Sequence, residues 1–168
     1  MWQPRVAFAT GGSTYNGATT INAGTLILSS GISGAQNLTL TGAGDTTISG
    51  AIAISSGSLI KNGSATATLS AANTYSGTST VNSGTLVAAA ANALGSTSQI
   101  VVTTGGSLLV TADDSVNNSA KVTLAGGSLA FSGNRSETFG ALTLSANSTL
   151  EWRHREQYGS VLYQLYGG

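Results

Sequence analysis

A short internal repeat, with a period of about 20 residues, is the feature that most constrains the fold. Residues 15–30 read YNGATTINAGTLILSS and residues 75–90 read YSGTSTVNSGTLVAAA, with seven of sixteen positions identical. The tripeptide Gly-Ser/Thr-Leu begins at Gly24, Gly57, Gly84, Gly106 and Gly127, and a degenerate copy begins at Asn147. From Gly84 onward the copies are evenly spaced, whereas the first two intervals are longer and together equal about three such steps. Repetition of this kind is typical of solenoid proteins.

The text between these signatures alternates apolar and hydroxyl side chains. Segments such as QIVVTTGGSLLVT (99–111) and KVTLAGGSLAFSG (121–133) follow this pattern and break at paired glycines. Alternation with period two predicts strands with one apolar face, and glycine pairs predict turns. The leucine-rich-repeat pattern is absent, and no helical stripe exceeds about two turns. The sequence therefore predicts an all-β fold, a right-handed single-stranded parallel β-helix (β-solenoid) with about 20–22 residues per coil and roughly seven coils.

Composition excludes several functional classes. Only 7% of the 168 residues are charged, six basic against six acidic, and the formal net charge is zero. A neutral chain with six cations does not predict nucleic-acid binding. No cysteine is present and there is a single histidine, which excludes disulfides, thiol chemistry and multi-histidine metal centres. We expect no cofactor, no metal site, no signal peptide and no transmembrane segment in this chain.

Two phrases carry a resemblance to a known family. An aromatic-Asn/Ser-Gly tripeptide followed by Asn-x-Gly-Thr-Leu occurs twice, at Tyr15, Gly17, Asn22, Gly24 and Leu26, and again at Tyr75, Gly77, Asn82, Gly84 and Leu86. This pattern resembles the autotransporter-associated β-strand repeat, and the resemblance covers roughly residues 10–150. It implies a structural role for these ten residues, in a parallel β-helix stalk that belongs to the passenger of a secreted or surface-attached type V protein. It also implies an extracellular or cell-surface location for the parent protein.

Three regions are expected along the chain. Residues 1–10 form an N-terminal edge or cap, and residues 11–150 form the β-solenoid repeat domain. Residues 151–168, EWRHREQYGSVLYQLYGG, hold four of the twelve charged residues, three of the five tyrosines and His154, the only histidine. This atypical tail is interpreted either as a cap on the last coil or as non-native sequence, and His154 as a solvated residue.

The few charged residues suggest one candidate cluster. Arg135 follows Asp114 by one repeat period, so stacked coils would place these two side chains together, with Asn134 over Asp113. The structural interpretation is an inter-coil ion pair between Asp114 and Arg135, which contributes about 0–1 kcal/mol at a surface. The functional interpretation is a groove in which Asp113, Asp114 and Arg135 bind or cleave an acidic sugar. Tyr15 and Tyr75 are expected to pack at equivalent corners rather than to stack on sugars.

Three functions remain open. The first is a structural stalk or adhesin scaffold without enzymatic activity. The second is a carbohydrate-binding or carbohydrate-cleaving β-helix, which requires a lateral groove lined by the charged cluster and an aromatic ring. The third is a self-associating, fibre-forming solenoid. The expected partners are accordingly host or surface glycans, or other copies that stack on the solenoid ends.

Overall fold

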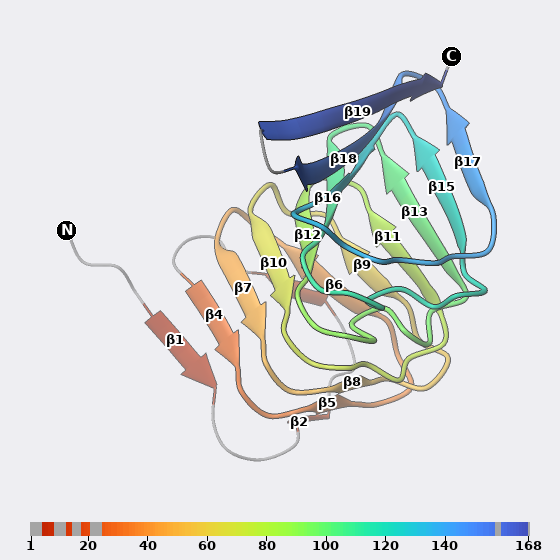
Figure 1. Cartoon of the computed structure of the whole chain (residues 1–168). Helices are drawn as coiled ribbons and strands as arrows, with labels where there is room; N and C mark the ends of the chain where they lie inside the picture. Colours follow the sequence, from red (N-terminus) through yellow and green to blue (C-terminus); the bar gives the residue numbers. More distant parts are fainter. Residues whose placement is uncertain (1–4, 9–12, 15–17, 21–24, 157–158, 168) are drawn as a thin grey trace.

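The computed structural model describes residues 5–8, 13–14, 18–20, 25–156 and 159–167, in which there are strands, turns and loops but no helix. The chain winds around one axis and visits the same sides of the coil in turn (Figure 1). All neighbouring strands are parallel except the last pair. The predicted β-solenoid is therefore confirmed, and its about six full turns are close to the roughly seven coils expected.

One side of the coil is a nine-stranded sheet. Its strands are β1 (Arg5–Phe8), β4 (Thr25–Leu28), β7 (Asp45–Ile48), β10 (Thr66–Leu69), β12 (Gly84–Ala88), β14 (Gly106–Val110), β16 (Ser128–Phe131), β18 (Ser148–Glu156) and β19 (Gly159–Gly167).

A second side is a seven-stranded sheet. Its strands are β3 (Ala18–Thr20), β6 (Leu38–Thr41), β9 (Leu59–Lys61), β11 (Thr78–Val81), β13 (Gln99–Thr103), β15 (Lys121–Ala125) and β17 (Leu142–Ser145).

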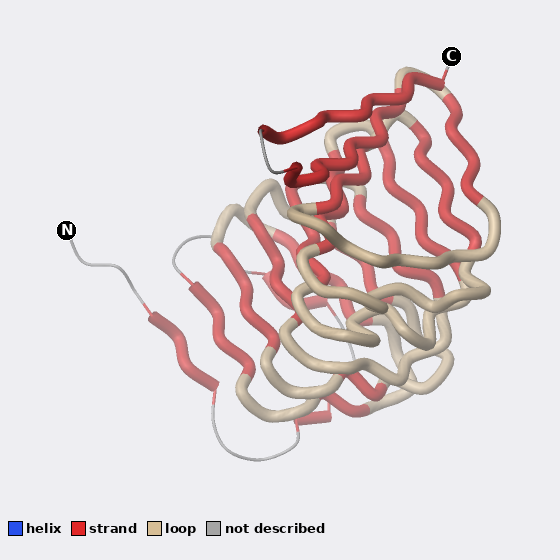
Figure 2. Tube along the Cα trace, in the orientation of Figure 1, coloured by secondary structure: helices blue, strands red, loops and turns tan. Residues whose placement is uncertain are grey.

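The third side is built from strands only in the first coils. These are β2 (Ser13–Thr14), β5 (Ile32–Ser33) and β8 (Ile52–Ala53), and later coils cross this side as loops (Figure 2).

The interior consists of stacked columns of side chains, because residues at equivalent positions of successive coils pair directly. In the nine-stranded sheet Leu86 pairs with Leu108, and Leu108 pairs with Leu129. These three side chains are at most 1% exposed. A strand buries every second residue, so the apolar half of the predicted alternation faces inward and the hydroxyl half faces solvent.

The irregular early spacing of the Gly-Ser/Thr-Leu signature has a structural cause. The copies at Gly84, Gly106 and Gly127 begin or directly precede strands of the nine-stranded sheet, whereas Gly57 precedes β9 of the seven-stranded sheet. The spacing of the coils themselves is regular, since Thr25 pairs with Asp45 and Thr66 pairs with Thr85. The signature therefore marks a corner of the coil that can precede either sheet.

The C-terminal end departs from the parallel arrangement. Strand β19 pairs antiparallel with β18, with Ser148 opposite Gly167 and Glu156 opposite Gly159. The expected boundary between residues 150 and 151 lies inside β18 and does not coincide with the end of a strand. The nine-stranded sheet thus ends in an antiparallel strand, while the seven-stranded sheet ends at β17.

Candidate functional site

The repeat motif forms a corner that joins successive coils. Gly84 has a φ of +68°, and a Cβ on it would lie 2.5–2.6 Å from carbonyl oxygens of residues 63–65. Its N–H donates a hydrogen bond of 3.0 Å to the carbonyl of Gly105 in the next coil. Only glycine combines a left-handed conformation with so close an approach of backbone. The equivalent motif residues Tyr15, Gly17, Asn22 and Gly24 lie outside the described residues, and Leu26 is buried.

Asn82 of the motif lies in an exposed polar ladder. Its Nδ2 donates a hydrogen bond of 2.8 Å to Oδ1 of Asn62 in the preceding coil. Its own Oδ1 accepts one of 3.2 Å from the hydroxyl of Thr103 in the following coil. Three coils are thereby joined through side chains as well as backbone. This is the kind of uncharged ladder that a chain with few charges can use at its surface.

Tyr75 heads the fully buried side chains by volume among the described residues, and it is only 1% exposed. Its hydroxyl lies 2.7 Å from Oγ of Ser79, which donates in turn to Oγ1 of Thr97 at 3.1 Å. Thr97 donates to the carbonyl of Gly77 at 2.6 Å. Burial raises the pKa of the Tyr75 hydroxyl far above its usual value, although the bond to Ser79 opposes this shift. Tyr75 therefore packs inward, where it cannot serve as a platform for sugars.

Asn73 lies on the third side of the coil, where the strand found in earlier coils gives way to a loop. Its side chain is 4% exposed, and Oδ1 accepts a hydrogen bond of 2.7 Å from the N–H of Ile52. Its Nδ2 donates one of 2.6 Å to the carbonyl of Ala93 in the following coil. The amide thus satisfies two backbone groups in the way that a peptide unit of a strand would.

Lys61 stands in an interior column in which its neighbours along the stack are Leu40 and Val81. The residue is 3% exposed, and its Nζ donates to the carbonyls of Gly63 and Ser83 at the corners of two coils. Burial lowers the pKa of the Lys61 amine below its usual value, while the nearby charge of Asp45 opposes that shift. Both carbonyl contacts are structural, since they tie one corner to the next.

The expected ion pair forms with a different aspartate. Nη1 of Arg135 lies 3.9 Å from Oδ1 of Asp113, and Asp114 is not its partner. The reason is the local coil length. The N–H of Asp114 bonds to the carbonyl of Ser136, and in the ladders of this molecule such a bond goes to the residue just before the level partner. Asp114 is therefore level with Glu137, beyond the Arg135 that the mean repeat period placed beside it. The Arg135 and Asp113 side chains are 33% and 53% exposed, so the pair contributes about 0–1 kcal/mol.

A further carboxylate joins the loop between β16 and β17 to the preceding coil. Oε2 and Oε1 of Glu137 accept hydrogen bonds from the N–H groups of Ser115 and Val116, at 2.8 and 3.1 Å. Burial raises the pKa of the Glu137 carboxyl above its usual value, and the charge of Asp114 adds to the rise, although the N–H donors oppose it. Glu137 is therefore a clamp between coils, and its acceptor atoms are already used by backbone.

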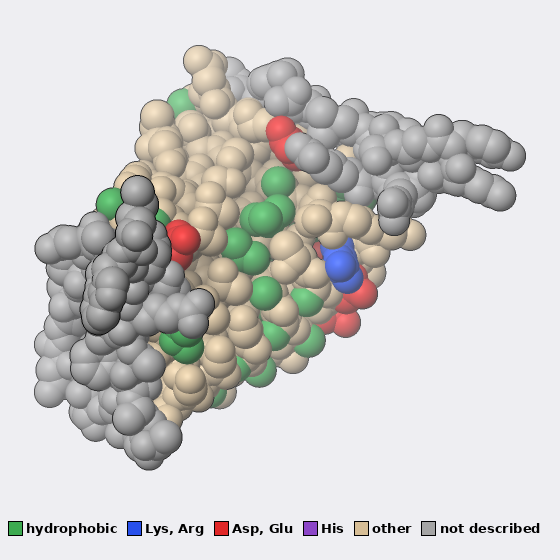
Figure 3. Space-filling view, turned by 90° about the vertical axis from the view of Figure 1, so that its left-hand side faces the viewer, with side chains coloured by type: hydrophobic (Ala, Val, Ile, Leu, Met, Phe, Trp, Pro, Cys, Tyr) green, Lys and Arg blue, Asp and Glu red, His purple; other side chains and the backbone are tan. Residues whose placement is uncertain are grey.

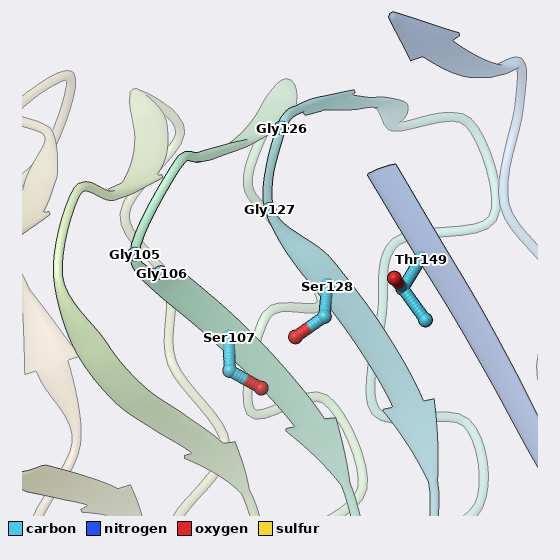
Figure 4. Close-up of a pocket in the computed structure, with 7 residues that line it drawn as sticks. All are labelled: Gly105, Gly106, Ser107, Gly126, Gly127, Ser128 and Thr149. Carbon is cyan, nitrogen blue, oxygen red and sulfur yellow. The ribbon is translucent and has the colours of Figure 1, made fainter. Parts of the chain in front are cut away.

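A shallow groove of about 300 Å³ runs across three coils at the corner formed by the paired glycines. Figure 4 shows Ser107, Ser128 and Thr149 in a row on β14, β16 and β18, beside Gly105–Gly106 and Gly126–Gly127. The three hydroxyl residues are direct neighbours in the ladder. Figure 3 shows a surface made mostly of uncharged polar groups and backbone, with scattered apolar side chains and few charges. The groove offers hydroxyl and amide contacts but no acid or base.

Asp114 lines a different groove, of about 240 Å³, with Asn92, Gly95, Val116, Asn117 and Asn118. Neither Asp113, Arg135 nor an aromatic ring contributes to it. Asp113, Asp114 and Arg135 therefore do not line the lateral groove that the carbohydrate hypothesis requires. Within the part of the chain that the structure describes, no three potential metal ligands cluster, and no helix could cross a membrane.

These observations define a class: a parallel β-solenoid in which the polar motif residues connect coils. Comparison with protein families then identifies the repeat, because the passenger-associated-transport-repeat model matches residues 8–28 and 59–88. The chain thus carries the passenger repeat that its motifs resemble, and that prediction is confirmed. Comparison with curated proteins and with solved structures gave no match.

The matched segments begin and end at strand boundaries. The first runs from the end of β1 to the end of β4, which is one coil. The second runs from the start of β9 to the end of β12 and includes the Asn82–Gly84 corner. Each match therefore ends at the end of a strand in the nine-stranded sheet, although the first covers one coil and the second about one and a half.

Sequence reasoning missed four of the residues that connect coils: Lys61, Asn73, Thr97 and Glu137. Lys61 had a signal, because it is a charged residue at an apolar position of an alternating strand. Asn73 precedes the motif tyrosine by two positions, but nothing in the sequence shows that its amide replaces a strand. Thr97 and Glu137 lie in loops whose path only the fold determines.

Proposed function

We propose that this chain is a structural segment of an autotransporter-like passenger, secreted or attached to the bacterial surface, where it acts as a stalk or adhesin scaffold. The observation that carries the proposal is that the passenger-repeat model matches two segments of the solenoid whose bounds fall at strand boundaries, described above. The motif residues by which the repeat is recognised, such as Asn82 and Gly84, also form hydrogen bonds between successive coils.

The mechanism is mechanical. Each coil pairs only with its neighbours, so the solenoid can form one coil at a time as the chain emerges, and each new coil uses the previous one as a template. The resulting rod is held by a backbone ladder along two sheets and by inward columns of Leu, Ile and Val. Surface residues are free to vary without disturbing that ladder. On this proposal the segment displays other modules and performs no chemistry itself.

Surface display tests the proposal. The chain is placed between a secretion signal and the translocator of a characterised autotransporter, with an N-terminal epitope, and antibody binding to intact cells is measured. A matched pair of variants on β14 separates folding from surface chemistry: Leu108→Asp puts a charge in the interior, whereas Leu109→Asp puts it on the outer face. We expect the native chain and Leu109→Asp to display a protease-resistant epitope, and Leu108→Asp to lose it. Equal display of all three would count against a folded stalk.

The carbohydrate hypothesis remains the alternative, and the hydroxyl row in the Gly105–Gly127 groove is what favours it. A glycan array probed with the purified chain distinguishes the two. Saturable binding that Ser128→Val abolishes would support a lectin-like role. No binding, together with successful display, supports the stalk.

A further inference from the structure

The outer face of the seven-stranded sheet carries a column in which every side chain is β-branched. Strand pairing sets its members directly beside one another in successive coils: Thr39, Ile60, Thr80, Val101, Thr123 and Thr143. Thr143 is exposed and the other five are partly exposed, and both chain neighbours of each of these five are buried. The column therefore points away from the interior.

A second outward column runs parallel to the first, two residues further along each strand. Its members are Thr41, Asn62, Asn82, Thr103, Ala125 and Ser145, all of them at least partly exposed. The hydrogen bonds that join Asn62, Asn82 and Thr103 hold the middle of this column in place. Neither column contains a charged residue or an aromatic ring, and the outward residue that precedes them on β15, Lys121, lies at the margin of the face.

The backbone fixes the spacing of the two columns. Neighbouring strands lie about 4.8 Å apart, and residues two apart in one strand lie about 6.7 Å apart. Successive members of the first column are 20 to 22 residues apart in the sequence, yet they pair one to one, because the loops absorb the difference. β-Branched side chains are stiff at χ1, so their methyl and hydroxyl groups repeat at the interval of the strands. Figure 1 shows β11, β13, β15 and β17 side by side along this face.

The outer face of the nine-stranded sheet lacks this regularity. Its equivalent central column consists of Thr47, Thr68, Val87, Leu109, Ala130 and Glu151. This column mixes β-branched side chains with a longer one, a smaller one and a charged one. The two faces of the same solenoid therefore differ in how evenly their side chains repeat.

The chemistry of the seven-stranded face restricts what can bind there. A face without charges does not attract an ionic ligand, and a face without rings offers no stacking platform. Neither of the two grooves described above is lined by a residue of these columns. The face instead presents methyl groups, over which water loses orientational freedom, and hydroxyl and amide groups, which hold water by hydrogen bonds. Because both kinds of group repeat in two directions, the matching ligand is one whose own surface repeats in two directions.

We propose that this face binds ice. The strand spacing of about 4.8 Å is close to the lattice repeat of ordinary ice, so water ordered over successive coils can join the crystal surface with little displacement. Each coil adds a small contact, and six coils in register add theirs together. A dissolved small molecule has no such repeat and would contact only one or two coils. The proposal goes beyond the stalk function and does not depend on secretion.

Ice-affinity measurements on the purified full chain test the proposal. Ice that grows slowly from a dilute solution excludes proteins that do not bind it, so enrichment in the ice fraction over a non-binding reference protein reports binding. We expect enrichment of the native chain, together with a measurable gap between its melting and freezing temperatures.

Two threonines provide a matched pair of variants. Thr80 on β11 and Thr68 on β10 are each the third residue of a four-residue strand with the same alternation of burial, but they face outward from different sheets. Tyrosine is well tolerated in strands, and it would protrude from either face. We expect Thr80→Tyr to abolish enrichment in ice and Thr68→Tyr to leave it unchanged. Thr80→Val keeps a β-branched side chain with methyl groups, like its neighbour Val101, and should retain binding.

Circular dichroism and the urea midpoint of each variant show whether it still folds. If Thr80→Tyr fails to fold, Thr123→Ser replaces it, since this change removes only the methyl group from the column and should lower enrichment in part. Enrichment of the native chain no greater than that of the reference protein would overturn the proposal. So would equal losses in the two tyrosine variants, or a loss in Thr68→Tyr alone.

Discussion

Removal of the Asn73 side chain is the sharpest test of how the coils are held together. Asn73 is the residue through which a loop replaces the third sheet, and its amide bonds the N–H of Ile52 and the carbonyl of Ala93. The substitution Asn73→Ala removes both bonds at a site that is 4% exposed. Two buried backbone groups in neighbouring coils lose their partners at once.

The expected magnitude follows from the burial of these groups. A buried polar group without a partner costs about 1–3 kcal/mol, so the variant should lose about 2–6 kcal/mol of unfolding free energy. For a chain of this length that corresponds to a fall of roughly 5–20 °C in Tm. The control is Asn62→Ala, since Asn62 accepts a comparable amide hydrogen bond from Asn82 but at the surface. Its cost should be about 0.5 kcal/mol or less.

Urea unfolding followed by far-UV circular dichroism measures both variants under identical conditions. A second variant, Asn73→Asp, keeps an oxygen that can accept from the N–H of Ile52. Its other carboxylate oxygen would face the carbonyl of Ala93, so that two acceptors oppose each other. At neutral pH it should be less stable than Asn73→Ala. Burial raises the pKa of such a carboxyl in the folded state, so its stability should recover as the pH falls and the protonated group donates. If Asn73→Ala costs no more than Asn62→Ala, the assignment of Asn73 as a substitute for a strand is refuted.

Three further outcomes are expected in the same assay. Gly84→Ala should lower the unfolding free energy by about 2 kcal/mol or more, because it adds a clash with backbone to a left-handed conformation. Gly105 has a φ of +90° and its nearest atom would lie 3.7 Å from the new Cβ, so Gly105→Ala should incur only the conformational cost of about 1–2 kcal/mol. Equal losses in the two variants would contradict the clash. Tyr75→Phe should cost about 1 kcal/mol by removing the hydroxyl from Ser79, and an unchanged midpoint would argue against the buried network. The unfolding free energy of the native chain, compared with that of Lys61→Met, should increase as the pH rises toward the ordinary lysine pKa of 10.5. The reason is that the lowered pKa of Lys61 in the folded state leaves the unfolded chain with more bound protons. A difference in unfolding free energy that stays constant between about pH 8 and 10.5 would refute the burial of this amine.

The cluster of Asp113, Asp114 and Arg135 shows which contacts the repeat spacing can predict and which it cannot. The repeat period was correct on average, and it brought Arg135 beside the Asp113–Asp114 pair. That coil is longer than the mean period, and the contact falls on Asp113 instead of Asp114. Loop length in one coil is a local property that a mean period does not contain. The ion pair is a surface contact in either case, so the error changes the partner and leaves the small energetic contribution unaltered.

The sequence alone determined the winding. Alternating Ile, Val and Leu with Thr and Ser assigns strand faces, and a short, regular repeat forces equivalent residues to stack, so the coil and its uncharged surface follow from local pattern. What only the tertiary structure decided is where polar groups become buried: Lys61 at a corner, Asn73 in place of a strand, and Tyr75 turned inward. These depend on which backbone groups of neighbouring coils are left without partners, and that is settled only when segments one coil apart in the sequence meet in space.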